Sequence, residues 1–143
     1  MSQPAIVIEW NASILDASAL MEERNVRRLP VVNDENTVIG IVSSGDVREA
    51  TSVYHTASPY APDQDEILLA VDEVMTTPAL TVTPDATLLD TVRLLVERKI
   101  GGVPVVDALG QPLGMITESD IFRLLLQEWS EREGDEEGDA EAA

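Results

Sequence analysis

Apolar positions recur at helical spacing in two stretches of the chain. In the later stretch they form a stripe of Leu88, Val92, Leu95 and Val96. This spacing places one apolar face along a helix. Asp85 is a residue type that caps helices, so we expect the helix to start near Ala86. The earlier stretch predicts a matching helix over about Ser13 to Arg24.

Each predicted helix is followed by two short apolar runs with a turn between them, which is the pattern of a β-hairpin. The runs are 29–32 and 38–43 in the earlier stretch, and 103–106 and 113–117 in the later one. Pro104 removes one backbone donor, so it belongs at the start or edge of a strand. A further strand is expected before each helix, at 5–9 and 79–83, and a helix should close each unit from Asp46 or Asp120.

The two stretches are copies of one unit. A shift of 74 residues lays residues 12–48 on 86–122 without a gap, and eleven of these 37 pairs are identical. Most other pairs are chemically alike, such as Val42 with Ile116 and Ser43 with Thr117. Such self-similarity is the signature of a duplicated supersecondary unit.

One βαββα unit alone would leave an apolar sheet face open, whereas two units packed sheet to sheet bury both faces. The sequence therefore predicts a mixed α/β (α+β) fold in which two units are related by a pseudo-twofold axis and leave two pseudo-symmetric clefts. We expect the first unit at 1–58, a linker with a short helix at 59–71, the second unit at 72–130 and an acidic disordered tail at 131–143. Within the linker, 51–64 reads as loop, and Asp65 is placed to cap a helix over 66–71.

Composition excludes several classes of function. The chain of 143 residues carries a net charge of −18, which argues against a nucleic-acid partner. It has no cysteine, and its single histidine, His55, falls in the expected loop, so thiolate, zinc and triad chemistry are all disfavoured. No apolar run approaches the ~20 residues that span a bilayer, and no signal-peptide pattern opens the chain. We therefore expect a soluble cytoplasmic protein without a metal, a membrane or a nucleic acid among its partners.

Both units end their second strand with Gly, two apolar residues, Ser or Thr, two residues and Asp. Ser43 and Asp46 occupy these positions in the first unit, and Thr117 and Asp120 in the second. A carboxylate can accept hydrogen bonds from a ribose diol while the hydroxyl lies beside a phosphate. The alternative is that both aspartates are helix N-caps, with Glu49 in the capping-box position after Asp46.

Five of the nine cations lie just before the Pro-Val-Val strands. They are Arg24, Arg27, Arg28, Arg98 and Lys99. Guanidinium groups suit phosphate oxygens, whereas the alternative is a set of solvated helix C-termini, where cations are also favoured. For Arg24 and Arg98 the two readings are balanced, and for Arg27 and Arg28 we favour phosphate.

Several motifs resemble the CBS domain, and the pair of units is similar to a CBS tandem, or Bateman module, over roughly residues 5–130. The motifs are 72–76 (DEVMT), 81–87 (TVTPDAT), 101–107 (GGVPVVD) and 114–120 (GMITESD). The segment 45–50 also resembles the stand-alone acetoin-utilisation-type CBS proteins. The first unit matches more loosely because it lacks a Val-Met-Thr lead-in and carries Arg27-Arg28 where the second has Gly101-Gly102.

This resemblance implies a regulatory module that binds AMP, ATP or another adenosyl ligand such as S-adenosylmethionine, has no catalytic residues and forms a homodimer. It assigns a ribose and phosphate role to Ser43, Asp46, Thr117 and Asp120. It assigns the adenine border to Arg28, Leu29, Pro30, Gly102, Val103 and Pro104, and the cleft edge to Thr81 and Val82. Arg27 and Arg28 either crowd one cleft or recruit phosphate, so we expect unequal occupancy and a larger effect of Asp120 than of Asp46.

Two other functions compete with ligand sensing. One is a structural dimerisation module with degenerate, unoccupied clefts. The other is an enzyme, which is the weakest reading because the chain lacks a metal set, a cysteine and a phosphate-cradling glycine loop. The regulated protein, the ligand and the orientation of the dimer are left open by the sequence.

Overall fold

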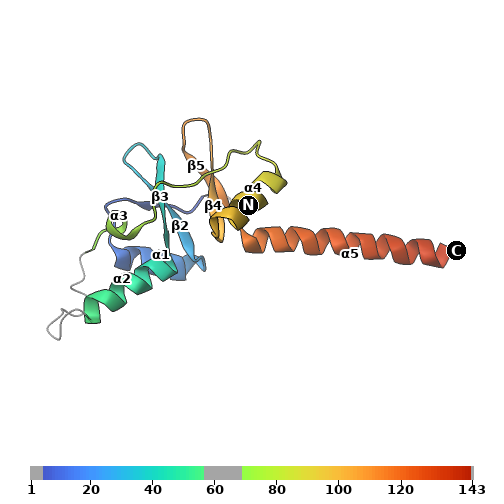
Figure 1. Ribbon diagram of the computed structural model, residues 1–143, viewed down its shortest axis with the longest axis horizontal. Coiled ribbons are helices and arrows are strands. Elements are labelled where there is room, and N and C mark those ends of the chain that lie inside the picture. The colour runs from blue at the N-terminus through green and yellow to red at the C-terminus, as the bar shows by residue number, and fades with distance from the viewer. Residues whose placement is uncertain (1–4, 57–68, 143) are drawn as a thin grey trace.

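The computed structural model describes residues 5–56 and 69–142, with side chains described to Ser52 and again from Leu69 to Glu133. The elements run in the order β1 (Ile8–Glu9), α1 (Ile14–Arg24), β2 (Arg28–Val32), β3 (Val38–Ser43), α2 (Ser44–Thr56), α3 (Val71–Val74), α4 (Leu88–Arg98), β4 (Gly102–Val106), β5 (Pro112–Thr117) and α5 (Glu118–Ala142). We call residues 5–56 the first copy and residues 79–142 the second copy. The mixed α/β class and the duplicated unit are confirmed (Figure 1).

The two sheets have the same plan. In the first copy β1 pairs parallel to β2, and β2 pairs antiparallel to β3. In the second copy β4 pairs antiparallel to β5, and Val82 forms one parallel bridge to Val105 in place of the outer strand. The pairs Ile8 with Val31 and Val82 with Val105 are separated by the same 74 residues as the rest of the repeat. The expected strand at 79–83 is therefore reduced to a single bridge.

Helix ends in the two copies match residue for residue. Ser13 and Thr87 cap α1 and α4 by accepting from the backbone N–H three residues later, at 3.0 Å in both cases. Asn25 and Lys99 end these helices in the left-handed conformation. Asp85 is therefore not the cap that the sequence predicted, because its Oδ1 instead accepts from Thr83 Oγ1 at 2.5 Å. The Thr87 hydroxyl takes the capping role, two residues closer to the apolar stripe.

The connections between units differ from expectation. Residues 51–56, predicted as loop, continue α2, and His55 therefore belongs to a helix. Asp65 and residues 66–68 lie outside the described residues, while Leu69 and Ala70 are not helical and the short helix begins at Val71. Ala70 is held in a bridge to Ser13, which fixes an extended backbone there. The tail expected to be disordered is helical to Ala142, since alanine and glutamate favour helix and single glycines cost only about 1 kcal/mol.

Helix α3 covers the first copy but has no counterpart over the second copy among the described residues. Val71 N donates to Ala12 O at 2.8 Å, and Ile14 N donates to Leu69 O at 3.0 Å. Ile14 is consequently 0% exposed, whereas its repeat partner Leu88 is 42% exposed. In Figure 1, α1 and α2 lie beneath one sheet, and α5 projects away from the body as one long helix.

We predict that truncation at these two matched positions has unequal costs. Ile14→Ala should lower the free energy of unfolding by about 2–5 kcal/mol, because it leaves a cavity in a closed core. Leu88→Ala should cost clearly less, because part of that side chain is already in water. Urea denaturation of both variants measures the difference, and equal losses would contradict the role given to α3.

We also predict a pH-dependent role for the Thr83 hydroxyl. Its hydrogen bond, followed by a backbone hydrogen bond, lowers the pKa of the exposed Asp85 carboxyl below its ordinary 3.8. A lowered pKa stabilises the folded state above the unfolded pKa, and that contribution is lost as pH falls through the folded pKa. Thr83→Val should raise the pKa of Asp85 in an NMR titration. The matched control is Thr81→Val, at a nearby exposed threonine, and an equal shift in both variants would argue against the hydrogen bond as the cause.

Candidate functional site

A cavity of about 250 Å³ lies where the two copies meet. It gathers a hydroxyl, a carboxylate and two cations with apolar side chains and glycine backbone. Its lining residues are Arg28, Ile41, Ser43, Asp46, Thr76, Pro78, Ala79, Leu80, Lys99, Ile100, Gly101 and Gly102. A larger groove of about 790 Å³ lies between α1 and α2, but none of the predicted site residues lines it.

Ser43 and Asp46 are set at the start of α2 by a reciprocal pair of hydrogen bonds. Ser43 N donates to Asp46 Oδ2 at 2.9 Å, and Asp46 N donates to Ser43 Oγ at 3.0 Å. This arrangement is a capping box in which Ser43 is the N-cap and Asp46 the third helical residue. The interpretation of Asp46 as the N-cap, with Glu49 as its capping-box partner, is therefore wrong. The capping box lies one turn earlier, between Ser43 and Asp46. Asp46 Oδ1 forms no hydrogen bond with the described residues and is free for a ligand.

Two cations line the cavity from opposite copies. Arg28 begins β2, and Lys99 ends α4 with a φ of 54°. Neither forms an ion pair within the part of the chain that the structure describes. In a chain of −18 net charge, two unpaired cations facing one small cavity create a local site for an anion.

The Arg28 side chain of the first copy packs against the backbone of Gly101 in the second copy. A Cβ built on Gly101 would overlap the Arg28 guanidinium. A larger residue at this position would therefore displace the flexible end of the Arg28 side chain from its place beside the Gly101 backbone. The sequence difference between Arg27-Arg28 and Gly101-Gly102 is therefore complementary, since the large residue of one copy fills space left by the small residue of the other.

The segment before the second copy forms a wall that the sequence analysis did not assign to the site. Thr76 N donates to Ile41 O at 2.8 Å, and Ile41 N donates to Thr76 O at 3.2 Å. These bonds hold residues 76–80 beside the end of β3, so that Thr76, Pro78 and Leu80 reach the cavity. The available signal was the Val-Met-Thr segment at 74–76, which is one of the motifs that resemble the CBS domain. The resemblance did not assign this segment to a cleft.

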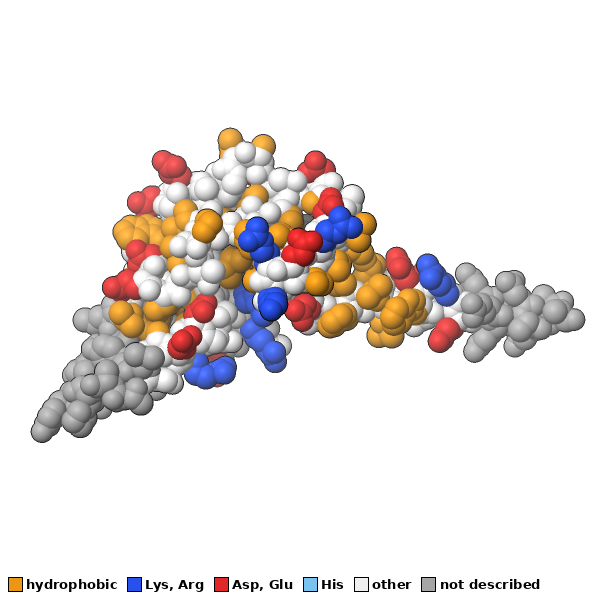
Figure 2. All heavy atoms as spheres, in the orientation of Figure 1, with side chains coloured by type: hydrophobic (Ala, Val, Ile, Leu, Met, Phe, Trp, Pro, Cys, Tyr) orange, Lys and Arg blue, Asp and Glu red, His pale blue; other side chains and the backbone are white. Residues whose placement is uncertain are grey.

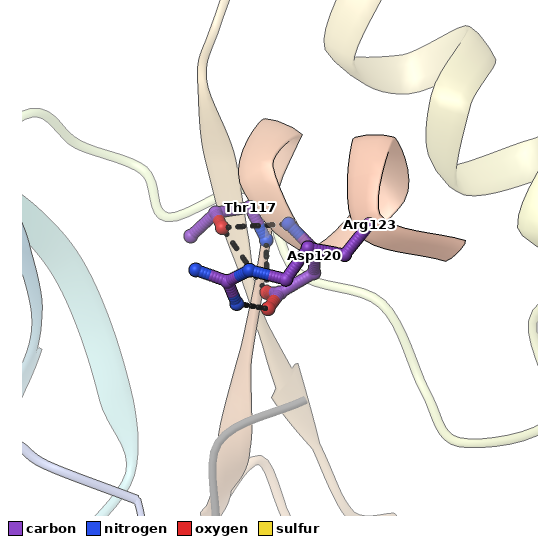
Figure 3. Close-up of polar contacts among 3 residues, drawn as sticks. All are labelled: Thr117, Asp120 and Arg123. Atoms are coloured by element: carbon purple, nitrogen blue, oxygen red, sulfur yellow. Dashed lines mark hydrogen bonds and ion pairs between the residues drawn. The ribbon is translucent and has the colours of Figure 1, made fainter. Parts of the chain in front are cut away.

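Thr117 and Asp120 do not line this cavity. Asp120 Oδ2 accepts from Thr117 N at 2.9 Å and from Thr117 Oγ1 at 3.1 Å, and Oδ1 pairs with Arg123 at 3.4 Å (Figure 3). Both oxygens of Asp120 are thus engaged, whereas Asp46 keeps one free. By the repeat, the wall matching 76–80 would be residues 2–6, of which 2–4 lie outside the described residues.

The other predicted residues fall into three groups. Leu29, Pro30, Val103 and Pro104 are buried in the central strands, with their side chains in the packing of each sheet. Val82 N donates to Pro104 O at 3.0 Å, while Thr81 is exposed. Arg27 is exposed, and its carbonyl accepts from Ser44 N at 2.9 Å. Of the predicted set, the cavity brings together Arg28, Ser43, Asp46 and Gly102.

The described residues show neither a cluster of metal ligands nor a membrane-spanning helix. Within 5–56 and 69–142, no three or more aspartate, glutamate, histidine or cysteine side chains cluster closely enough to hold a metal ion. The helices of the same ranges include none with the length and hydropathy needed to cross a membrane.

Three solved structures resemble this one over most of both chains. The CBS domain pair of protein MJ0100, in complex with 5′-methylthioadenosine and S-adenosyl-L-methionine, has a TM-score of 0.76 at 27% identity, covering 90% of this chain and 93% of that one. CBSX2 in complex with AMP has a TM-score of 0.69 at 32% identity, with 87% and 90% covered. An acetoin utilization protein (AcuB) from Vibrio cholerae has a TM-score of 0.74 at 28% identity, with 94% and 92% covered.

Curated relatives include proteins of similar and of much greater length. The chain spans 88% of a CBS domain-containing protein of Dictyostelium discoideum at 28% identity. It spans only 22% of the L-aspartate semialdehyde sulfurtransferase of Methanocaldococcus jannaschii at 27% identity. The activity named for that longer protein therefore belongs to a chain of which this one matches a part.

The family model described as "CBS domain" matches residues 1–52 and 71–127, which contain the repeated stretches 12–48 and 86–122. Sequence, topology and solved neighbours agree, and the resemblance to stand-alone acetoin-utilisation-type proteins is also supported. The chain belongs to the CBS domain family, as a CBS domain pair.

Proposed function

We propose that this CBS pair is a regulatory module that binds one adenosyl ligand in the cavity between its copies and catalyses no reaction. The single observation that carries the proposal is that Asp46, with one carboxylate oxygen unbonded among the described residues, lines the same cavity as Arg28 and Lys99. The ligands named for similar proteins, AMP for CBSX2 and adenosyl compounds for MJ0100, support the ligand class.

Each part of a nucleotide has a matching group in the cavity. Asp46 Oδ1 would accept from the ribose hydroxyls, and Arg28 and Lys99 would hold the phosphate. Ile41, Leu80 and Ile100 would pack against the base. The volume of about 250 Å³ is just below the ~300 Å³ at which typical small-molecule sites begin, so the proposal places the nucleoside in the cavity and the phosphate at its rim.

The cleft at Asp46 is the better candidate of the two. The sequence had given more weight to Asp120, since the second copy matches the family more closely. Asp120 already pairs with the largely exposed Arg123 and accepts twice from Thr117, so a ribose would have to compete with these partners. We therefore propose primary binding at Asp46, with the Asp120 cleft weaker.

A purely structural module is the second candidate, because the second copy exposes large apolar side chains that suit a subunit contact. The homodimer implied by the family is part of our proposal in either case. What separates the two functions is whether an adenosyl ligand binds at all. A regulated protein partner would be required only by the sensing function.

We predict that AMP stabilises the protein through Asp46. A ligand at 100 times its dissociation constant adds ~2.7 kcal/mol to the free energy of unfolding, which raises the melting temperature by several degrees. A thermal-shift panel with AMP, ADP, ATP and S-adenosylmethionine measures this. Asp46→Asn keeps an oxygen for the capping box but removes the charge, so the shift should be lost. The matched variant Asp120→Asn should keep most of it.

The same panel can overturn the proposal. If none of the four ligands shifts the melting temperature, the structural function is favoured. If Asp120→Asn loses the shift and Asp46→Asn retains it, the assignment of the cleft is reversed. Conversion of any of these nucleotides by the purified protein would show that the module is an enzyme.

We further predict that the two cations discriminate AMP from adenosine. Arg28→Gln and Lys99→Gln should each weaken AMP binding about tenfold in calorimetry and leave adenosine binding nearly unchanged. Arg24→Gln is the control, since Arg24 is exposed in the last turn of α1 and does not line the cavity. Equal losses for AMP and adenosine would mean that the cations shape the cavity without binding phosphate.

A further inference from the structure

A groove of about 490 Å³ opens on the second copy, between the start of α4 and the first turns of α5. Its apolar lining consists of Leu88, Ile116, Ile121 and Leu124, and Arg123 is among its polar residues. Leu88 is 42% exposed and Leu124 39%, so large apolar side chains in this groove are in contact with water. Figure 2 shows hydrophobic side chains gathered along the first part of α5. We call this the α4–α5 groove.

In the first copy the matching place is filled by α3. Subtracting the repeat of 74 from the four apolar lining residues gives Ile14, Val42, Val47 and Ala50. The first three share one buried cluster with Val71 of α3, and Ala50 packs against that cluster. The α4–α5 groove is therefore the counterpart of the seat of α3, without an occupant among the described residues.

The backbone groups that receive α3 are repeated as well. In the first copy Ile14 N donates to Leu69 O at 3.0 Å, and Val71 N donates to Ala12 O at 2.8 Å. The matched groups of the second copy are Leu88 N and Ala86 O. Neither has a hydrogen-bond partner within 5–56 and 69–142. An incoming segment that lies beside them would complete the same two bonds, which gives the groove a preferred direction of binding.

We propose that the α4–α5 groove binds a short segment of a partner protein with the chemistry of residues 69–76. In this chain that segment is an extended stretch followed by one helical turn. Leu69, Val74 and Met75 pack against the core, whereas Asp72 and Glu73 are exposed. The inference rests on the proposed function for the role of the partner, as the regulated protein, and on the groove itself for the binding.

The acidic character of the partner segment follows from a reversal of charge between the copies. Glu49 of the first copy is replaced by Arg123 in the second. The Arg123 side chain is 77% exposed, and its ion pair is with Asp120, at 3.4 Å (Figure 3). An exposed cation at the groove of a chain of −18 net charge gives an acidic segment a local partner.

The chain itself offers no equivalent occupant among its C-terminal residues. After Trp129 the sequence contains no apolar side chain larger than alanine, so residues 130–143 lack the leucine and valine anchors of α3. In a second copy of the chain, α3 is already packed in the core of its own first copy. A partner protein is therefore the occupant that the chemistry of the groove favours.

The first experiment uses an end-capped, fluorescently labelled peptide of residues 69–76 (LAVDEVMT), added to the full chain without nucleotide. Its anisotropy should rise to saturation. Leu88→Asp and Leu124→Asp should each weaken binding at least about tenfold, because each puts a charge into an apolar seat. Leu109→Asp is the matched control, since Leu109 is 76% exposed and does not line the groove. Circular dichroism reports whether each variant folds, and equal losses in all three would overturn the assigned groove.

Substitutions in the peptide test the two parts of the proposed chemistry. A peptide with Val71→Asp and Val74→Asp should not bind. Arg123→Glu in the protein should weaken the native peptide about threefold, the scale of an exposed ion pair. A peptide with Asp72→Asn and Glu73→Gln should bind the wild type and the Arg123→Glu variant equally. If the native peptide also binds both proteins equally, the preference for an acidic segment is wrong.

The second experiment locates the bound segment through one backbone atom. If the peptide docks as α3 does, Leu88 N donates to a peptide carbonyl. Saturating peptide should then slow hydrogen exchange of the Leu88 amide at least about tenfold, measured by NMR. Protection of the groove between α1 and α2, with no change at Leu88, would overturn the assigned site.

Each failure has a distinct signature. Loss of peptide binding with a retained AMP shift would remove the docking site and leave ligand sensing intact. Peptide binding without any AMP shift would support the groove and count against ligand sensing. Binding that appears only after deletion of residues 1–4 would identify the chain's own N-terminus as the occupant and overturn the proposal. A chain that does not bind the peptide, and whose oligomers dissociate in sedimentation when Leu88→Asp is introduced, would identify a second copy and overturn it too.

Discussion

Burial of one central strand in each copy is the constraint on which the rest of the molecule depends. Every residue of β4, and all but the first of β2, is buried. Each strand carries a proline that cannot donate to a ladder, and its neighbours pair with it in the same register in both copies. Because the strand is fixed on both faces, the residues at its start are fixed as well. Arg28 and Gly102 therefore enter the inter-copy cavity from defined positions.

The chain contains two copies of one unit, and the copies differ in complementary ways. Helix α3 closes the core over Ile14 in the first copy, whereas Leu88 stays partly open in the second. Arg28 of the first copy occupies the space that Gly101 of the second leaves free. A repeated fold therefore tolerates specialisation wherever a residue does not face the shared core.

The fold was largely predictable from sequence because hydrophobic spacing and an ungapped repeat are local signals. The strands, the helix periods and the shared Ser/Thr and Asp positions followed from them. The role of Thr87 as the N-cap of α4 could not be predicted, because Asp85 is an equally good capping residue by type. Only the structure shows that the Asp85 carboxylate accepts a hydrogen bond from Thr83 instead. The wall at Thr76 to Leu80 was also missed, because it depends on a bridge to Ile41 that no spacing in the chain reveals. Likewise, only geometry shows that Arg123 occupies the Asp120 oxygen whose counterpart on Asp46 stays free.

Lys99 ends α4 at the wall of the cavity, and Val96 lies one turn earlier on the same helix. Because the rise of an α-helix is only 1.5 Å per residue, Val96 lies within about 5 Å of Lys99 along the helix axis. One end of α4 therefore carries both a cation at the cavity wall and a large apolar side chain on the molecular surface.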